Sequence, residues 1–395
     1  PVLSESAMPH LLALEVEGRV LRCRLEGRQA WCDRRLLARI HRETLDRLRR
    51  EIEPVTAAEF WRFLACWQHA ADGYRLEGPR GVVQAARQLA GFEIPAAAWE
   101  ADVLPSRIQG YRAEWLDQVT LSGELAWGRL WGGGRSPIRS TPVSLLPREE
   151  LDVWLSLAPP SGAAVAGEAP EVSTYADLVL SILMSRGPSF AQDIARHTGL
   201  LPSHVEAGLA ELIGLGLTTC DSWSGLRRLI TPVSRRRGVM KRVPFAPPGR
   251  WTGLRSLACG GASGPGDARR GDAAFARAAE ADAEFIARRL LGRYGVVFRR
   301  LLDRERLPVA WRDLVRVYRL WELRGDVRGG RFVQRFAGEQ YAVPEAVDLL
   351  RRLRRSESGS GAGVKISAAD PLNLDGILTP EPRISSQTRR RVLVA

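Results

Sequence analysis

Apolar residues between positions 174 and 233 follow a helical period first and a strand-like pattern afterwards. Two short helices are expected before Pro202, where the fixed φ of proline suits the first turn of a third helix. Four apolar residues of this third helix share one face, at i, i+4, i+7 and i+8: Val205, Leu209, Leu212 and Ile213. Segments 217–223 and 226–232 are then expected to form two strands. Three helices followed by a β-hairpin predict a winged-helix domain.

The same order of elements recurs at residues 78–147 and about 277–346, as expected for an internal repeat. In the last repeat, residues 296–305 are expected to form the second helix and residues 326–336 the first strand of the wing. Gly325 stands between the third helix and this strand. We expect it to cap the helix, because glycine readily adopts the left-handed conformation needed there.

Two amphipathic helices are predicted at 34–51 and 56–70, between the first two units, and the first has a stripe of apolar residues: Leu36, Ile40, Leu45 and Leu48. Residues 1–33 match only the closing helix and hairpin of a winged helix, so the sequence is expected to begin inside one. The predicted domains are a partial winged helix (1–33), a helical connector (34–77), a winged helix (78–157), a linker (158–173), a winged helix (174–245), a linker or loop (246–276), a basic winged helix (277–355) and a C-terminal β segment (364–395).

These patterns predict a mainly α fold with small β-hairpins, of the α+β class. It would consist of tandem winged-helix domains plus a small C-terminal β element or barrel. With 395 residues, 45% of them hydrophobic, the chain is long enough for several packed cores.

The charge of the chain favours a polyanionic partner. Lys and Arg exceed Asp and Glu by 58 to 45, which gives a net charge of +13. Residues 288–355 alone hold 18 arginines and 8 acidic residues, a net charge of +10. An arginine-rich proteome is the alternative explanation of the overall excess. No run of eighteen apolar residues occurs, so we expect no membrane partner.

The last unit is the predicted nucleic-acid contact. Its third helix places one set of residues on a packing face and its arginines on another, and further arginines cluster around the helix-to-wing transition. Gly329 and Gly330 are expected to permit close approach of the backbone to a phosphate. The competing account pairs some of these arginines with acidic neighbours, Glu322, Asp326 and Glu339. The predicted nucleic-acid-binding residues are Arg312, Arg316, Arg319, Arg324, Arg328, Arg331 and Arg335, with Arg227 and Arg228 from the preceding unit.

Several kinds of chemistry are not expected in this chain. Residues 131–137, WGGGRSP, lack the lysine and the following helix of a phosphate-binding loop, so the chain alone should not hydrolyse ATP. The five cysteines are scattered without a C-x-x-C pair, and the histidines lack the spacing of a zinc site. This usage favours a reducing, cytoplasmic location and no metal site.

Four segments in order resemble the C-terminal region of the large helicase-related (Lhr) proteins: residues 30–68, 91–108, 328–352 and 367–380. Lhr proteins are superfamily 2 ATP-dependent DNA helicases of DNA repair, with motor domains that precede this region. The resemblance implies tandem winged helices with a small β-barrel, similar in fold to AlkZ-type DNA glycosylases. It also implies that ATP and Mg belong to motor domains outside this sequence, and that this chain has no cofactor of its own.

The resemblance and the charge together predict a nucleic-acid-binding and assembly module of such a helicase. Its expected partners are DNA, single-stranded or fork-like, and the motor domains of its own protein, with homo-oligomerisation as a further possibility. The chain by itself is not expected to be catalytic.

The alternative is a DNA glycosylase domain fused to the helicase. AlkZ-type enzymes use a Q-x-Q pair, which this sequence lacks; the nearest glutamines, Gln84 and Gln88, are four residues apart. An aspartate-based mechanism stays open, with Asp33, Asp370 and Asp375 as candidates. A winged-helix scaffold for self-association is the third hypothesis.

Overall fold

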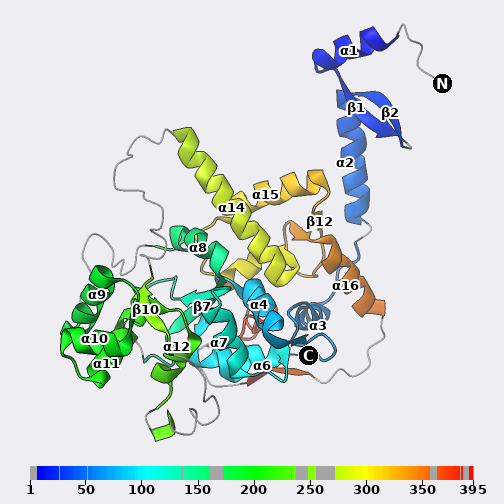
Figure 1. Ribbon diagram of the computed structural model, residues 1–395. Helices are drawn as coiled ribbons and strands as arrows, with labels where there is room; N and C mark the ends of the chain where they lie inside the picture. Colours follow the sequence, from blue (N-terminus) through cyan, green and yellow to red (C-terminus); the bar gives the residue numbers. More distant parts are fainter. Residues whose placement is uncertain are drawn as a thin grey trace.

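The computed structural model is mainly helical with small antiparallel sheets (Figure 1). It describes residues 7–25, 27–50, 52–134, 137–159, 172–232, 234–236, 248–254, 272–355, 363–382, 384–385 and 391–394. Most of the expected linkers 158–173 and 246–276 lie outside the described residues.

The unit predicted at 78–157 has the expected winged-helix order. Its helices are α4 (Gly78–Leu89), the segment α5 (Ala96–Ala98), η2 (Trp99–Val103) and α6 (Leu104–Arg107), and α7 (Ala113–Leu121). The wing strands are β6 (Leu125–Gly128) and β7 (Pro142–Pro147). The short strands β3 (Leu76–Glu77), β4 (Ile94–Pro95) and β5 (Ile108–Gln109) and the closing helices η3 (Arg148–Glu150) and α8 (Leu151–Leu157) complete it.

The next unit confirms the three helices but corrects the wing. Helices α9 (Thr174–Arg186), α10 (Ala191–Thr198) and α11 (Pro202–Gly214) precede strand β9 (Thr218–Cys220). The predicted second strand at 226–232 is wrong, because these residues belong to helix α12 (Trp223–Ile230), capped by the Ser222 side chain. The strand that pairs with β9 is β10 (Arg250–Gly253), within the expected linker. Strand β8 (Ser189–Phe190) pairs on its other side.

The last unit contains α14 (Asp272–Tyr294), α15 (Trp311–Arg324) and α16 (Pro344–Arg355). The expected helix at 296–305 is wrong: its first residues form strand β11 (Val296–Phe298), and the rest is a 3-10 helix, η5 (Arg299–Arg304). The wing strands are shorter than predicted, β12 (Arg328–Gly330) and β13 (Gln340–Ala342).

The three units share one sheet topology, which confirms the internal repeat. The strand orders are β4-β7-β6, β8-β10-β9 and β11-β13-β12, so in each unit the second wing strand lies between the first and an early strand. All of these pairs are antiparallel. One fold has therefore been used three times with different surfaces.

The N-terminal residues form a hairpin on a protruding helix (Figure 1). Helix α1 (Met8–Val16) is followed by the antiparallel strands β1 (Val20–Leu25) and β2 (Arg28–Asp33), and then by α2 (Arg34–Arg50). Helix α2 has no buried residue. The predicted apolar stripe is present, but Leu36 and Ile40 are 41% and 46% exposed.

Helix α3 (Ala57–Trp67) begins with a capping box between Thr56 and Glu59, and its apolar side belongs to the core of the last unit. Phe60 packs on Phe63 and on Phe298 of β11, with ring centroids 5.7 and 5.8 Å apart. A second core joins the other two units, where Trp127 meets Trp223 and Trp251 edge to face. Helices α3 and α4 are neighbours in the sequence but contribute to different cores.

The C-terminal β element is a two-stranded sheet rather than a barrel. Strands β14 (Val364–Ser367) and β15 (Arg391–Val394) pair antiparallel, and no barrel occurs in the described parts of the chain. The residues after β14 are held by polar contacts. Arg107 of α6 donates to both carboxylate oxygens of Asp370, at 2.6 and 2.8 Å, and both side chains are almost completely buried.

Replacing Asp370 by alanine is expected to lower the free energy of unfolding by about 3–5 kcal/mol, because it leaves the buried Arg107 guanidinium without its counter-charge. Urea unfolding followed by tryptophan fluorescence measures this loss. The double replacement Arg107→Met and Asp370→Ala should recover part of it, and Asp375→Ala should cost far less. An Asp370→Ala protein as stable as the parent would refute this role.

Glu93 is expected to make stability depend on pH. Its carboxylate accepts the N–H groups of Leu130 and Trp131 at 2.7 and 2.9 Å, and burial raises its pKa from 4.5 to about 7 despite these bonds. The folded protein therefore binds the proton more tightly than the unfolded chain does. The stabilisation is complete below pH 4.5 and is lost as the pH rises through 7, by up to about 3 kcal/mol.

The variant Glu93→Gln should lose this pH dependence and melt at a higher temperature than the parent at pH 8. Melting curves between pH 5 and 8 test it, with Glu114→Gln as the control on an exposed residue of the same unit. Equal pH profiles for parent and Glu93→Gln would contradict the assignment.

Candidate nucleic-acid interface

The turn from α15 into its wing is built as the sequence predicts. Gly325 adopts a left-handed conformation with φ 87°, and its N–H donates to the carbonyl oxygen of Glu322 at 3.0 Å. The chain then enters β12, where Arg328 is paired with Ala342 of β13. Gly325 is therefore the helix C-cap that starts the wing.

The two glycines of β12 serve internal packing. A Cβ on Gly329 would lie 2.4 Å from Oε1 of Glu322, whose carboxylate accepts the Gly329 N–H at 3.0 Å. A Cβ on Gly330 would lie 2.3 Å from Cδ1 of Ile52. Close approach of the backbone is thus real, but its partners are a buried carboxylate and an isoleucine of this chain. The anion next to the backbone of Gly329 is therefore the carboxylate of Glu322, not the phosphate that the sequence analysis expects.

Glu322 also joins the wing to α2. Its carboxylate accepts Nε of Arg49 at 2.8 Å and Nη2 at 2.5 Å, and the Glu322 side chain is only 4% exposed. Such a bidentate guanidinium–carboxylate contact fixes both position and orientation. This contact attaches the start of the wing rigidly to α2.

The connection between α2 and α3 braces the wing loop. Val55 forms a parallel bridge with Val333: its N–H donates to the carbonyl of Phe332 at 2.7 Å, and its carbonyl accepts the N–H of Gln334 at 2.9 Å. From inside the loop, Oε1 of the buried Gln340 accepts the N–H groups of Phe332 and Val333. Side chains on this loop are thereby presented from a fixed backbone, which lowers the entropic cost of binding.

Four predicted arginines lie on or next to this braced wing: Arg324, Arg328, Arg331 and Arg335. Arg324, Arg331 and Arg335 are exposed and Arg328 is half-buried. Within the described part of the chain, none of the four has an ion-pair or hydrogen-bond partner for its guanidinium. Arg335 has φ 68°, an uncommon conformation for a residue with a side chain. These guanidinium groups are available to an external anion.

The other three arginines of α15 are engaged with acidic neighbours. Arg312 and Arg316 both lie near the Asp313 carboxylate, at 3.7 and 3.4 Å. Arg319 binds Glu339 at 2.9 Å, and although burial raises the pKa of Glu339, the bonds from Arg319 and Tyr341 leave it lowered overall. The competing ion-pair account therefore describes this face of α15. It does not describe the wing.

Arg227 and Arg228 lie elsewhere, in α12 of the preceding unit. The Arg227 side chain is 10% exposed and binds Glu100 at 2.7 Å and Asp117 at 2.6 Å, so it is an internal contact between units. Arg228 is exposed and pairs with Glu206 at 2.9 Å. The structure does not bring these two arginines to the wing of the last unit.

Two parts of the chain match known domain families. Residues 55–148 match the third winged-helix domain of large helicase-related proteins, and residues 276–362 match the fourth. The chain carries two winged-helix domains of the Lhr family. The first match begins at Val55, so it includes α3, and the second contains the braced wing.

Two full-length relatives are similar to the chain over most of its length. The "Lhr helicase/ probable uracil glycosylase" of Mycolicibacterium smegmatis is 29% identical over 392 residues, which cover 96% of this chain and 25% of the relative. The "Lhr helicase/uracil glycosylase" of Escherichia coli is 26% identical over 394 residues, covering 89% of this chain and 24% of the relative. The chain spans about a quarter of the length of these relatives.

The three aspartates considered for glycosylase chemistry have different surroundings in the structure. Asp33 caps α2 by accepting the N–H groups of Arg35 and Leu36, which lower its pKa. The carboxylate of Asp370 forms an ion pair with Arg107, and its side chain is 1% exposed. Asp375 is half-buried, which raises its pKa, and its carboxylate has no hydrogen-bond partner within the described residues. Of the three aspartates, Asp375 is the one whose carboxylate makes no hydrogen bond among the described residues.

The two glutamines do not form a pair. Nε2 of Gln88 donates to the carbonyl oxygens of Trp67 and Gly292, which ties α4 to its neighbours. Nε2 of Gln84 lies 3.3 Å from Nε2 of His69 at the surface. Among the described residues there is no cluster of metal-ligating side chains, and no helix is long and apolar enough to cross a membrane.

Next to the braced wing lie further arginines that the sequence analysis did not select. Helix α16 carries Arg351, Arg352, Arg354 and Arg355 on exposed positions beside the braced loop. The run RRLRR was visible in the sequence, but only the packing of α16 against the α2–α3 connection shows which of its members face the wing.

Replacing Arg328, Arg331 and Arg335 together by alanine should weaken binding to single-stranded DNA of any sequence. The log–log dependence of affinity on salt should flatten by about two to three units, because each lost phosphate contact removes roughly 0.7 to 0.9. Thermal stability should stay nearly unchanged, since the three guanidinium groups have no partner in the described structure. Fluorescence anisotropy at several salt concentrations measures the effect.

The matched control removes the same charge from exposed arginines of the other units that have no partner among the described residues: Arg80, Arg148 and Arg186. This control should change affinity and salt slope much less. An equal effect of both triple variants would show that net charge alone is responsible, and a large loss of stability in the wing variant would assign these arginines a structural role.

Proposed function

We propose that this chain is the nucleic-acid-binding and assembly module of an ATP-dependent Lhr-type DNA helicase that acts in DNA repair. The observation that carries the proposal is the braced wing of the last unit, whose unpaired arginines extend from a backbone fixed by Glu322, Val55 and Gln340. Rigid presentation of cations suits contact with a phosphate backbone, which positions nucleic acid without reading its sequence. Single-stranded or forked DNA is the proposed ligand.

The assembly part of the proposal rests on the N-terminal hairpin and α2. Apolar side chains are exposed along this protruding element, including Leu12, Leu36 and Ile40 at about 41–46%. Exposed apolar residues gathered on one element are typical of a surface that contacts further protein. The proposed partner is the helicase motor of the same protein, to which ATP and Mg would bind. Self-association is the alternative use of this surface, and light scattering of the purified chain distinguishes the two.

A second function is suggested by the names of the two relatives, which include uracil glycosylase. In this chain Asp375 is the aspartate whose surroundings suit that role, because its carboxylate is half-buried and has no hydrogen-bond partner in the described structure. A raised pKa and an unengaged carboxylate are compatible with acid–base work on an extruded base. Asp370 would not serve, since its carboxylate is held by Arg107.

The purified chain is expected to bind single-stranded and forked DNA, to hydrolyse no ATP with or without DNA, and to release no base from uracil-containing DNA. Anisotropy, phosphate release and alkaline cleavage of a uracil-containing oligonucleotide measure these three outcomes. Base release that Asp375→Asn abolishes while leaving DNA binding intact would establish the glycosylase instead. Absence of DNA binding at low salt would overturn the proposal itself.

A further inference from the structure

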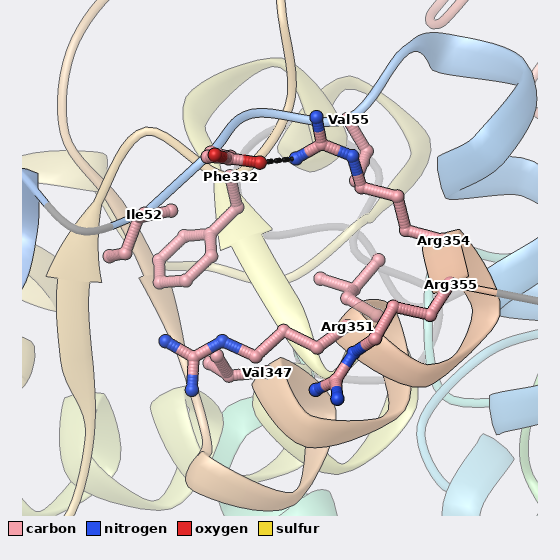
Figure 2. Close-up of a pocket in the computed structure, with 9 residues that line it drawn as sticks. Ile52, Val55, Phe332, Val347, Arg351, Arg354 and Arg355 are labelled. Carbon is pink, nitrogen blue, oxygen red and sulfur yellow. Dashed lines mark hydrogen bonds and ion pairs between the residues drawn. The ribbon is translucent and has the colours of Figure 1, made fainter.

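A cleft of about 340 Å³ opens where two segments of the last unit meet the connection between α2 and α3 (Figure 2). One side is the connection between α2 and α3, the second is the wing loop at Phe332, and the third is α16. The cleft is connected to the wing arginines through Phe332, which directly follows Arg331 in the chain. It therefore continues the candidate nucleic-acid interface.

The inner wall of the cleft is apolar. Phe332, Val347 and Leu350 line it while being only 2–6% exposed, and Ile52 contributes from the opposite side. These side chains belong to the core of the last unit, so the wall is not free to rearrange. A planar apolar group entering the cleft would meet a preformed surface, as is usual for small-ligand sites.

The rim of the cleft is cationic. Arg351, Arg354 and Arg355 share one face of α16 because they are three and four residues apart. Arg354 pairs with Glu53, whereas Arg351 and Arg355 have no ion-pair partner in the described part of the chain. Figure 2 shows Arg351 extending past Val347 toward the side of Phe332, while Arg354 turns away to the other end of the cleft.

We propose that this cleft takes one nucleotide of a bound single strand, with its base against the apolar wall and the phosphates on its two sides contacted by Arg351 and Arg355. The proposal rests on the nucleic-acid binding proposed above and names where a base is accommodated. After the ion pair of Arg354 with Glu53, the rim retains two positive charges, which complement the phosphates on either side of one nucleotide. A neutral apolar ligand would leave those charges unused, and a bare phosphate would leave the wall unused.

The combination of wall and rim fits an unpaired nucleotide better than a duplex. A base enters such a cleft only when it is not paired or stacked on its neighbours, and in a single strand that condition is met at little cost. The wing would hold the strand by its phosphates, and the cleft would hold it by one base. The cleft therefore predicts a preference for single strands that the wing alone would not give.

The test compares two DNA strands of equal length and charge, oligo-dT and a strand of abasic deoxyribose phosphates. The parent protein is expected to bind oligo-dT about tenfold more tightly, as is typical for contact with a base. The double variant Arg351→Gln and Arg355→Gln should weaken binding of oligo-dT about tenfold and binding of the abasic strand much less. Both substitutions are on exposed helical positions, so folding should be unaffected.

The control is Arg352→Gln, at an exposed position of the same helix but outside the lining of the cleft. It should change both affinities equally and slightly. A 5-iodouracil-substituted strand should also photo-crosslink to the peptide that contains Phe332, and the double variant should reduce this crosslink.

The outcomes separate this proposal from the proposed function. Equal weakening of both strands by the double variant would show phosphate contact without a base in the cleft and would overturn the inference. Unchanged binding in the double variant, with binding still lost in the wing triple variant, would overturn the inference and leave the proposed function standing. Failure of the parent chain to bind either strand would refute both.

Discussion

The ion pair between Arg107 and Asp370 holds together segments that are far apart in the sequence. Arg107 closes the second helical segment of one winged helix, Asp370 follows β14, and Oε1 of Gln68 at the end of α3 accepts a second bond from the same guanidinium at 3.0 Å. Removing these charges from water is costly, and close hydrogen bonds between the two groups in a fixed geometry offset that cost. The arrangement therefore specifies one packing of the C-terminal segment, with Trp61 of α3 donating to the carbonyl of Leu372 at 2.7 Å. It also occupies the Asp370 carboxylate, which a catalytic role would require to be accessible.

The position of α3 determines where the candidate interface can form. In the sequence α3 precedes the unit at 78–157, but its aromatic side chains complete the core of the last unit. The short connection from α2 to α3 is consequently brought against the last wing, where Val55 pairs with Val333. The same connection places Arg49 on the carboxylate of Glu322 and Ile52 at the cleft. The wing and the cleft thus both depend on the packing of α3 against the last unit, although α3 precedes this wing by almost 270 residues in the sequence.

The sequence predicted what local patterns control and missed what tertiary contacts control. The order of helices, the Gly325 cap and the recurrence of three winged helices follow from periodicity, and the structure confirms them. Segment 226–232 has the apolar composition of a strand, yet it forms α12 because the Ser222 cap starts a helix and Arg227 is taken up by Glu100 and Asp117. Gly329 correctly indicated a close approach, but its partner, Glu322, could not be identified without the fold. Likewise, the RRLRR run shows charge, whereas its division into cleft-facing and outward-facing arginines depends on how α16 packs.

A comparison of the three repeats supports placing the proposed binding surface on the last of them. In the unit at 174–254, the acidic residues of α11 are used internally: Glu211 accepts the Ser173 hydroxyl and N–H at the start of α9, and Glu206 pairs with Arg228 and Arg236. In the unit at 78–157, Asp117 of α7 binds Arg227 and so joins two units. The acidic side chains of these helices are thus engaged in contacts within the chain. In the last unit the buried carboxylate of Glu322 is satisfied by Arg49 and a backbone N–H, so it neutralises none of the wing arginines. In the last repeat, four arginines on or next to the wing have no partner among the described residues, and the wing backbone is fixed from both sides. Both properties suit a surface that binds a polyanion.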